Sequence, residues 1–167
     1  MATAKYTALA EITLSSSASS VTFGSIPQGY RDLMLVLSGG YTSSYFPQLR
    51  FNGDAGNNYT WVLAGTSGAS TQVLSSSNPY DPNLDGLLLG WEISGTSSSV
   101  SFVIEIMDYK ATDKHKTALT RANKDSTSLV MNAGRWANTA AITSVEFNTN
   151  GTGTFNTGST FCLYGVK

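Results

Sequence analysis

The sequence contains a single histidine, His115, and histidine is the side chain most often used to activate a serine or cysteine nucleophile. His115 lies in the charged run DYKATDKHK, while serines occur along the whole chain and none stands in a G-x-S-x-G turn. We therefore predict that His115 is an exposed hairpin residue, that the chain has no catalytic residues and that it is not an enzyme.

Three carboxylates, Glu92, Glu105 and Asp108, lie on or near two consecutive predicted strands. Two carboxyl groups are enough for glycoside hydrolysis, so a glycan hydrolase is one hypothesis for the chain. Glu92 and Glu105 alternate with the apolar residues of their strands, however, which places both on the solvent side. Surface carboxylates are the favoured interpretation, and the sequence has no phosphate-binding loop or dinucleotide fingerprint.

A cluster of oxygen-bearing side chains lies around a predicted turn at Asn52-Gly53. Besides Asn52 it contains Asp54, Asn57 and Asn58, which offer the hard oxygen ligands that calcium prefers. Because only one of them is a carboxylate, a hydrogen-bonded Asx turn is the favoured interpretation and calcium the alternative. We predict no metal site and no cofactor.

Several aromatic residues lie in or beside segments rich in turn-forming residues. Rings exposed on loops can stack on sugars or anchor protein partners, although a core position is equally open for Trp136. The residues expected to bind partners are Tyr6, Tyr41, Tyr45, Phe46, Tyr80 and Trp136. The segments expected to take part are Ala2 to Tyr6, Tyr41 to Pro47 and Pro79 to Leu84.

The charge content is low, because Asp, Glu, Lys and Arg make up only 13% of the residues, roughly half the usual share. Serine, threonine, asparagine and glycine take their place, as suits strand faces and turns. Such a surface is either simply neutral or buried against other subunits, where charges would be costly to desolvate. With a net charge of −1, the chain has no electrostatic footprint for nucleic acid.

Local features of the chain point the same way. The basic stretch from Lys110 to Lys124 is interrupted by Asp113 and has few aromatic residues, which favours a solvated hairpin. The single cysteine, Cys162, excludes an internal disulfide framework and is expected to be a small core side chain. Because no long apolar run occurs, we expect neither a signal peptide nor a membrane span, and production in a cytoplasm.

The elements that position these residues are expected to be short β-strands, because apolar residues recur with a period of two and helical periodicity is absent. About ten strands at this spacing predict an antiparallel all-β sandwich, jelly-roll-like, as one domain over residues 1–167. The predicted strands cover residues 6–14, 21–23, 32–38, 48–52, 59–64, 86–94, 100–108, 115–122, 126–132, 142–148 and 160–166.

Some of these strands have a predicted place in the sheets. The uninterrupted apolar run from Leu33 to Leu37 indicates a central strand with both faces covered, by a loop or another subunit. Residues 86–94 and 100–108 form the clearest predicted hairpin, and 115–122 with 126–132 a second one. Residues 65–85 are expected to be a long loop, and the C-terminal strand is expected to seal a sheet edge.

Three stretches of the chain also carry a resemblance to a known family. They are LSSSASSVTFGSIPQGYRDLMLVLSG at Leu14 to Gly39, LRFNGDAGNNYTW at Leu49 to Trp61, and GSTFCLYGVK at Gly158 to Lys167. Together they resemble small β-sandwich virion proteins of tailed bacteriophages, including cyanophages, which serve as capsid decoration proteins or as tail and fibre components. The resemblance implies a homo-oligomer, often a trimer, on the outside of a virus particle assembled in the host cytoplasm.

The function that the resemblance implies is structural. We expect a capsid decoration, or cement, protein that binds the major capsid protein or other virion proteins. The alternative is a tail-fibre or receptor-binding module that recognises a glycan on the host surface through loop aromatics. Neither role calls for nucleic acid or a membrane as a partner.

Overall fold

Alternating apolar residues produce thirteen β-strands and no helix in the part of the chain that the computed structural model describes, residues 5–42, 47–67, 70–76, 85–90, 98–124, 128–149 and 153–167. The strands are β1 (Tyr6–Thr13), β2 (Ser20–Phe23), β3 (Asp32–Thr42), β4 (Gln48–Phe51), β5 (Tyr59–Ser67), β6 (Ser70–Ser76), β7 (Leu87–Leu88), β8 (Ser98–Met107), β9 (Lys116–Lys124), β10 (Ser128–Trp136), β11 (Val145–Asn148), β12 (Thr154–Phe155) and β13 (Thr160–Val166). The all-β prediction is confirmed. In the described residues no helix is long and apolar enough to cross a bilayer.

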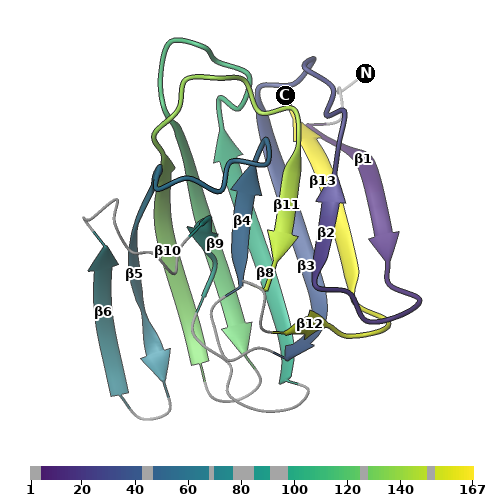
Figure 1. Ribbon diagram of the computed structural model, residues 1–167, viewed down its shortest axis with the longest axis vertical. Coiled ribbons are helices and arrows are strands. Elements are labelled where there is room, and N and C mark those ends of the chain that lie inside the picture. Colours follow the sequence, from purple (N-terminus) through teal and green to yellow (C-terminus); the bar gives the residue numbers. More distant parts are fainter. Residues whose placement is uncertain are drawn as a thin grey trace.

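The strands form two antiparallel sheets. The larger has nine strands in the order β1-β13-β3-β8-β9-β10-β5-β6, with β12 paired to β3, and the smaller has the order β2-β11-β4-β7. Figure 1 shows the smaller sheet lying over the middle of the larger one, with β1 and β6 at the two opposite margins. Because the chain changes sheet at each step from β1 to β5, the sandwich is jelly-roll-like, as predicted.

The core lies between the two sheets and is rich in aromatic residues. Phe51 of β4 packs against Trp136 of β10 with ring centroids 5.5 Å apart, and Phe147 of β11 packs against Phe161 of β13 at 5.2 Å. These pairs join the small sheet to both halves of the large one. Edge-to-face and tilted ring pairs of this kind add to the free energy gained from burying their area.

The strand from Leu33 to Leu37 is central, as predicted, because β3 lies between β13 and β8. Leu33, Leu35 and Leu37 are fully buried in the sandwich core. Met34 and Val36 point to the opposite side of the sheet, where they are only half-buried. The second face of this strand is therefore covered in part, by neighbouring side chains of the same sheet.

The predicted hairpin of residues 86–94 with 100–108 is wrong. β7 pairs with β4 in the small sheet, whereas β8 pairs with β3 and β9 in the large one. Alternation tells which residues share a face but not which strand lies beside them, and β7 belongs to the other layer. Residues 91–97 lie outside the described part of the chain.

Two further predictions about edges and loops are corrected. β13 does not seal an edge, because β1 pairs with its other side. Residues 70–76, expected within a long loop, form β6 and pair antiparallel with β5. A margin strand needs few inward apolar residues, so the serines and threonines that suggested a loop are compatible with it. The predicted second hairpin is confirmed, because β9 pairs with β10.

Candidate interaction surface

The exposed large hydrophobic side chains gather on one surface, the side of the large sheet that faces away from the small sheet, here called the outer face. Those on β5, β8, β9 and β10 alternate with residues buried in the core, so they point outward. Val73 of β6 and Tyr6 of β1 share this side by register, opposite Ala64 of β5 and Val166 of β13. In the described residues this set is Tyr6 (55% exposed), Val62 (53%), Val73 (70%), Met107 (47%), Leu119 (46%), Leu129 (58%) and Met131 (59%). Every one of them belongs to a strand of the large sheet.

The middle of the outer face is hollowed, because small residues of β10 lie between larger ones. Ala133 stands in register with Val62 of β5 on one side and Leu119 of β9 on the other. A depression of about 730 Å³ lies here, and a second one of about 510 Å³ shares Val62, Leu119 and Ala133 with it. Together they form a shallow trough across β5, β10, β9 and β8, called the outer-face trough below.

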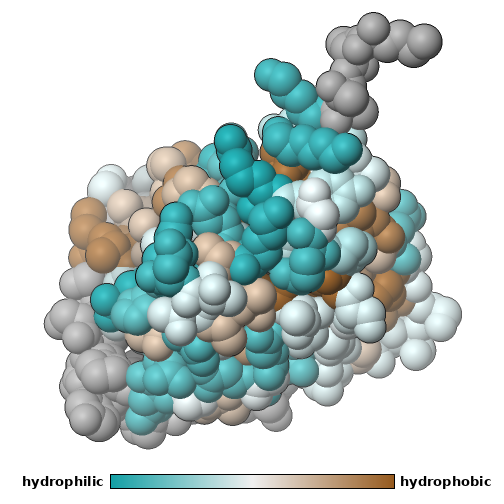
Figure 2. All heavy atoms as spheres, turned by 90° about the horizontal axis from the view of Figure 1, so that it is seen from above, coloured by the Kyte–Doolittle hydropathy of each residue, from teal (hydrophilic) through white to brown (hydrophobic). Residues whose placement is uncertain are grey.

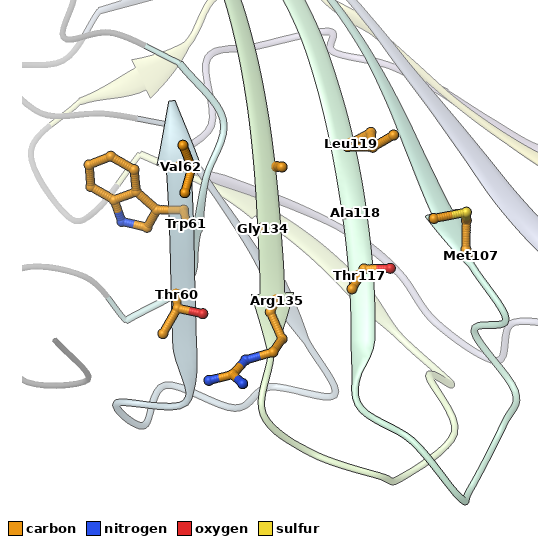
Figure 3. A pocket seen from close by; sticks show the side chains of 10 residues that line it. Thr60, Trp61, Val62, Met107, Thr117, Ala118, Leu119, Gly134 and Arg135 are labelled. Atoms are coloured by element: carbon orange, nitrogen blue, oxygen red, sulfur yellow. The ribbon is translucent and has the colours of Figure 1, made fainter. Parts of the chain in front are cut away.

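Figure 3 shows how the side chains of this trough are arranged. Val62, Leu119 and Met107 are apolar positions on β5, β9 and β8, and Arg135 with Thr60 lies toward one end. Because Gly134 carries no side chain, β7 can approach the inner side of β10: a Cβ at Gly134 would lie 1.8 Å from Leu87 Cδ1. The trough and the core beneath it thus depend on the same small residues.

Charged groups on the outer face are few. Arg121 Nη2 lies 3.1 Å from Glu105 Oε1, and both side chains are largely exposed, at 62% and 49%. An exposed pair of this kind contributes only about 0–1 kcal/mol to stability. Arg135 has no ion pair among the described residues. The face is therefore mainly apolar, with a cationic group beside the trough.

The end of the sandwich that carries the loops after β2, β4, β8 and β10 has a different character. Figure 2 looks onto this end and shows hydrophilic residues over most of it. Asp108, in the turn after β8, forms a largely exposed ion pair of 3.0 Å with Lys114. Glu105 and Asp108 therefore form separate ion pairs, with Arg121 and Lys114. Glu105 is solvent-facing, as predicted, and Glu92 lies outside the described residues.

The aromatic residues expected to bind partners are only partly accounted for. Tyr6 is exposed on β1, but Tyr41 and Trp136 are each 1% exposed, so their prediction as partner-binding residues is wrong. β3 continues past its predicted end and places Tyr41 beside Phe102 and Phe155, at centroid distances of 6.3 and 6.1 Å. Trp136 shares the inward phase of β10. Tyr45, Phe46 and Tyr80 lie outside the described residues, as do residues 2–4, 43–46 and 79–84 of the predicted segments.

In the oxygen-rich loop after β4, side-chain oxygens of Asp54 and Asn52 accept hydrogen bonds from the protein itself. Asp54 accepts from the amide of Gly56 at 2.8 Å, from Asn58 Nδ2 at 2.9 Å and from Trp136 Nε1 at 2.7 Å. Burial acts to raise the pKa of Asp54, but these three hydrogen bonds outweigh it and the pKa is lowered. Asn52 Oδ1 accepts from the amides of Thr143 and Ser144. The Asx-turn interpretation is therefore confirmed at Asp54.

Three other predicted positions have a definite place in the structure. His115 is exposed before β9, as expected. Lys116, expected in a solvated hairpin, is instead 1% exposed, and its Nζ donates to the carbonyls of Lys114 (3.0 Å) and Thr139 (3.1 Å). Burial lowers the pKa of Lys116. Cys162, expected in the core, is half-buried on the outer face, because β13 places Phe161 and Leu163 inward.

Sequence reasoning missed the outer-face residues, although a signal was present. The uninterrupted apolar run that marked β3 recurs in shorter form at Trp61-Val62-Leu63 in β5, at Ala118-Leu119 in β9 and at Leu129-Val130-Met131 in β10. An apolar residue on both phases of a strand indicates that both faces of the sheet are apolar. Applied to all strands, that signal would have predicted this surface.

Comparisons with known proteins place the chain in no family. No family model matches it, and no curated protein is significantly similar. Among solved structures, the Caenorhabditis elegans galectin LEC-6 has 9% identity and a TM-score of 0.36 over 92% of this chain and 94% of its own. Alginate lyase Aly36B has 10% identity and a TM-score of 0.32, over 93% and 77%. A human SPRY domain has 10% identity and a TM-score of 0.21, over 93% and 97%. Likenesses this weak carry no argument about binding or catalysis.

Proposed function

We propose that this chain is a non-enzymatic structural protein of a bacteriophage particle, a decoration protein that binds the capsid exterior through its outer face. The single observation that supports this most is the apolar character of that face. An antiparallel sheet that faces water normally carries polar residues there, and contiguous exposed apolar patches mark interaction sites. The resemblance of three stretches to virion proteins of tailed bacteriophages is the reason for proposing a bacteriophage particle.

The size of the outer face suits a protein interface. β5, β9 and β10 each have nine residues, and five neighbouring strands of that length cover roughly 700 Å². A standard interface buries about 800 Å² on each partner. Many copies bound to one lattice would brace neighbouring capsid subunits together, because repeated modest contacts add through avidity.

The particle itself provides the test of this function. Quantitative mass spectrometry of purified virions should find this chain at a copy number comparable to that of the major capsid protein. Particles assembled without it should lose their genome at a lower temperature or lower external osmotic stress. A copy number of only a few per virion would exclude decoration and would favour a tail component.

A second candidate function is a receptor-binding module that recognises a host glycan. One observation favours it: the outer-face trough ends at Arg135 beside the hydroxyls of Thr60 and Thr117, a combination of hydrogen-bond donors with an apolar floor. Glycan-array binding that is lost in Arg135→Ala and retained in Lys110→Ala, an exposed cation in the loop after β8 that does not line the trough, would support this role. An array without binding by the wild-type chain would exclude it for the glycans tested.

A further inference from the structure

In the described part of the chain the two sheets have four edge strands, and three of them carry features that prevent pairing with another chain. β2 has four residues and β7 only two, so both offer short edges. β1 is interrupted by a register shift between Ala8 and Ala10, and it carries the charge of Glu11. Short strands, bulges and charges are the usual means by which natural sheets block edge-to-edge association.

The fourth edge strand, β6, has none of these features. Its seven residues, Ser-Thr-Gln-Val-Leu-Ser-Ser, include no charge, no proline and no glycine. Its register with β5 runs without a shift from Trp61 opposite Ser76 to Ser67 opposite Ser70. Figure 1 shows β6 at the margin of the large sheet, and in the described residues only β5 pairs with it.

The residue at the middle of β6 is also the most exposed large hydrophobic residue among those described. Val73 is 70% exposed and has three residues of the strand on each side. On the outer face it stands in register with Ala64 of β5, which in turn is in register with Met131 of β10. A straight, uncharged edge with an exposed β-branched residue is a template for strand addition.

We propose that β6 pairs antiparallel with β6 of a second copy of this chain, around a two-fold axis at Val73. Val73 then lies opposite the partner's Val73, Gln72 opposite the partner's Leu74, and Thr71 opposite the partner's Ser75. β-Branched residues directly opposite each other stabilise antiparallel strands.

A second copy of this chain is the partner that fits the uncharged strand β6. In a two-fold antiparallel pair, each residue of β6 lies opposite a residue of the partner's β6. A charged residue on the axis would therefore lie opposite the same charge in the partner. β6 contains no charge that could oppose this arrangement. A strand that served a charged peptide partner would be expected to carry complementary charges, and this one carries none.

The pairing would have a consequence for the outer face. A two-fold axis perpendicular to the sheet keeps both outer faces on the same side, so the row of Val73, Ala64 and Met131 continues into the same row of the second copy. The contact is isologous and closes at two copies, unlike the trimer that the family resemblance implies. The inference goes beyond the proposed function, because the pair would form without any capsid.

Sedimentation equilibrium of the full chain tests the proposal. The wild-type chain should reach a mass of twice 17.7 kDa. Val73→Lys and Val73→Glu each place two like charges opposite each other, so each should weaken the pair at least tenfold, while an equimolar mixture of the two should restore a mixed pair. Met131→Lys, at a position that is also exposed on this row (59%) but lies on an interior strand, is the matched control and should pair like the wild type.

Several outcomes would overturn the proposal: a monomeric or trimeric wild-type chain, a pair that withstands Val73→Lys, or a pair that is lost in Met131→Lys instead. Because Val73 is exposed, the variants are expected to keep the wild-type circular-dichroism spectrum, and the mixing experiment succeeds only if both are folded. Binding of each variant to capsids is measured separately, so that loss of pairing and loss of the proposed function are distinguished.

Discussion

Trp136 Nε1 donates a hydrogen bond of 2.7 Å to Asp54 Oδ2, which ties the loop after β4 to the last residue of β10. The bond joins the small sheet to the large one at the polar end of the sandwich. It also explains why a tryptophan next to a turn-rich segment is a core residue: its ring packs on Phe51 and its only polar atom is satisfied by the loop.

Asp54→Asn should lower the free energy of unfolding by about 1–3 kcal/mol, because an amide cannot accept all three of the hydrogen bonds that the carboxylate accepts. Urea denaturation followed by tryptophan fluorescence measures the change. Asp113→Asn, at an exposed position in the loop after β8, is the matched control and should leave the midpoint unchanged. Equal midpoints for all three chains would show that the Asp54 hydrogen bonds contribute no net stability.

The carboxylate of Asp54 should make the folded state less stable at low pH. Because the pKa of Asp54 is lower in the folded than in the unfolded state, its stabilising contribution is full above the unfolded value of about 3.9 and is lost as pH falls through the folded pKa. Urea midpoints measured from pH 6 down to pH 2 should therefore fall more steeply for the wild type than for Asp54→Asn. Parallel curves would contradict this assignment.

Buried tyrosines should make the folded state less stable at high pH. Burial raises the pKa of Tyr41 and of Tyr59 above the ordinary value of about 10. Their contribution to stability is complete below that value and is lost as pH rises above it, because only the unfolded state can then ionise these phenols. Absorbance at 295 nm should show exposed tyrosines ionising first and the buried ones only together with loss of the β-sheet circular-dichroism signal. A single transition that precedes unfolding would contradict the prediction.

Gly134→Ala should destabilise the fold by about 1–3 kcal/mol, because the added Cβ would overlap Leu87 Cδ1 and push β7 away from β10. Gly24→Ala, where a Cβ meets no atom within 4 Å, is the matched control and should be close to neutral. Because Leu87→Ala makes room for the added methyl group, the double variant should lose less stability than the two single variants summed. A Gly134→Ala chain with wild-type stability would show that β7 does not depend on this close approach.

The alternation of apolar residues was sufficient to predict which residues of most strands face the core. It correctly identified β3 as central and β9 with β10 as a hairpin. It could not assign β7 to the small sheet or β1 to the position outside β13, since both depend on contacts between residues far apart in the sequence. Tyr41 and Trp136 were misplaced for a related reason: their strands run further than their apolar patterns suggested.

The candidate site was predicted less well than the fold. Aromatic residues in turn-rich segments are the ones that the sequence predicts to bind partners. In the described part of the chain, however, the exposed large hydrophobic residues lie on strands. Val62, Leu119 and Met131 lie next to core residues in sequence and differ from them only in phase. Which of two apolar phases faces the core is decided by the position of the second sheet, and this information is not local in sequence.

Binding of the outer face to the capsid can be measured by co-sedimentation of the purified chain with undecorated capsids. The double variant Leu119→Lys, Met131→Lys places two charges on the face, and Lys110→Ala with Lys114→Ala is the control at the polar end. We expect at least a tenfold loss of capsid binding for the first variant and wild-type binding for the second. Full binding by the outer-face variant, with loss in the polar-end variant, would contradict this expectation.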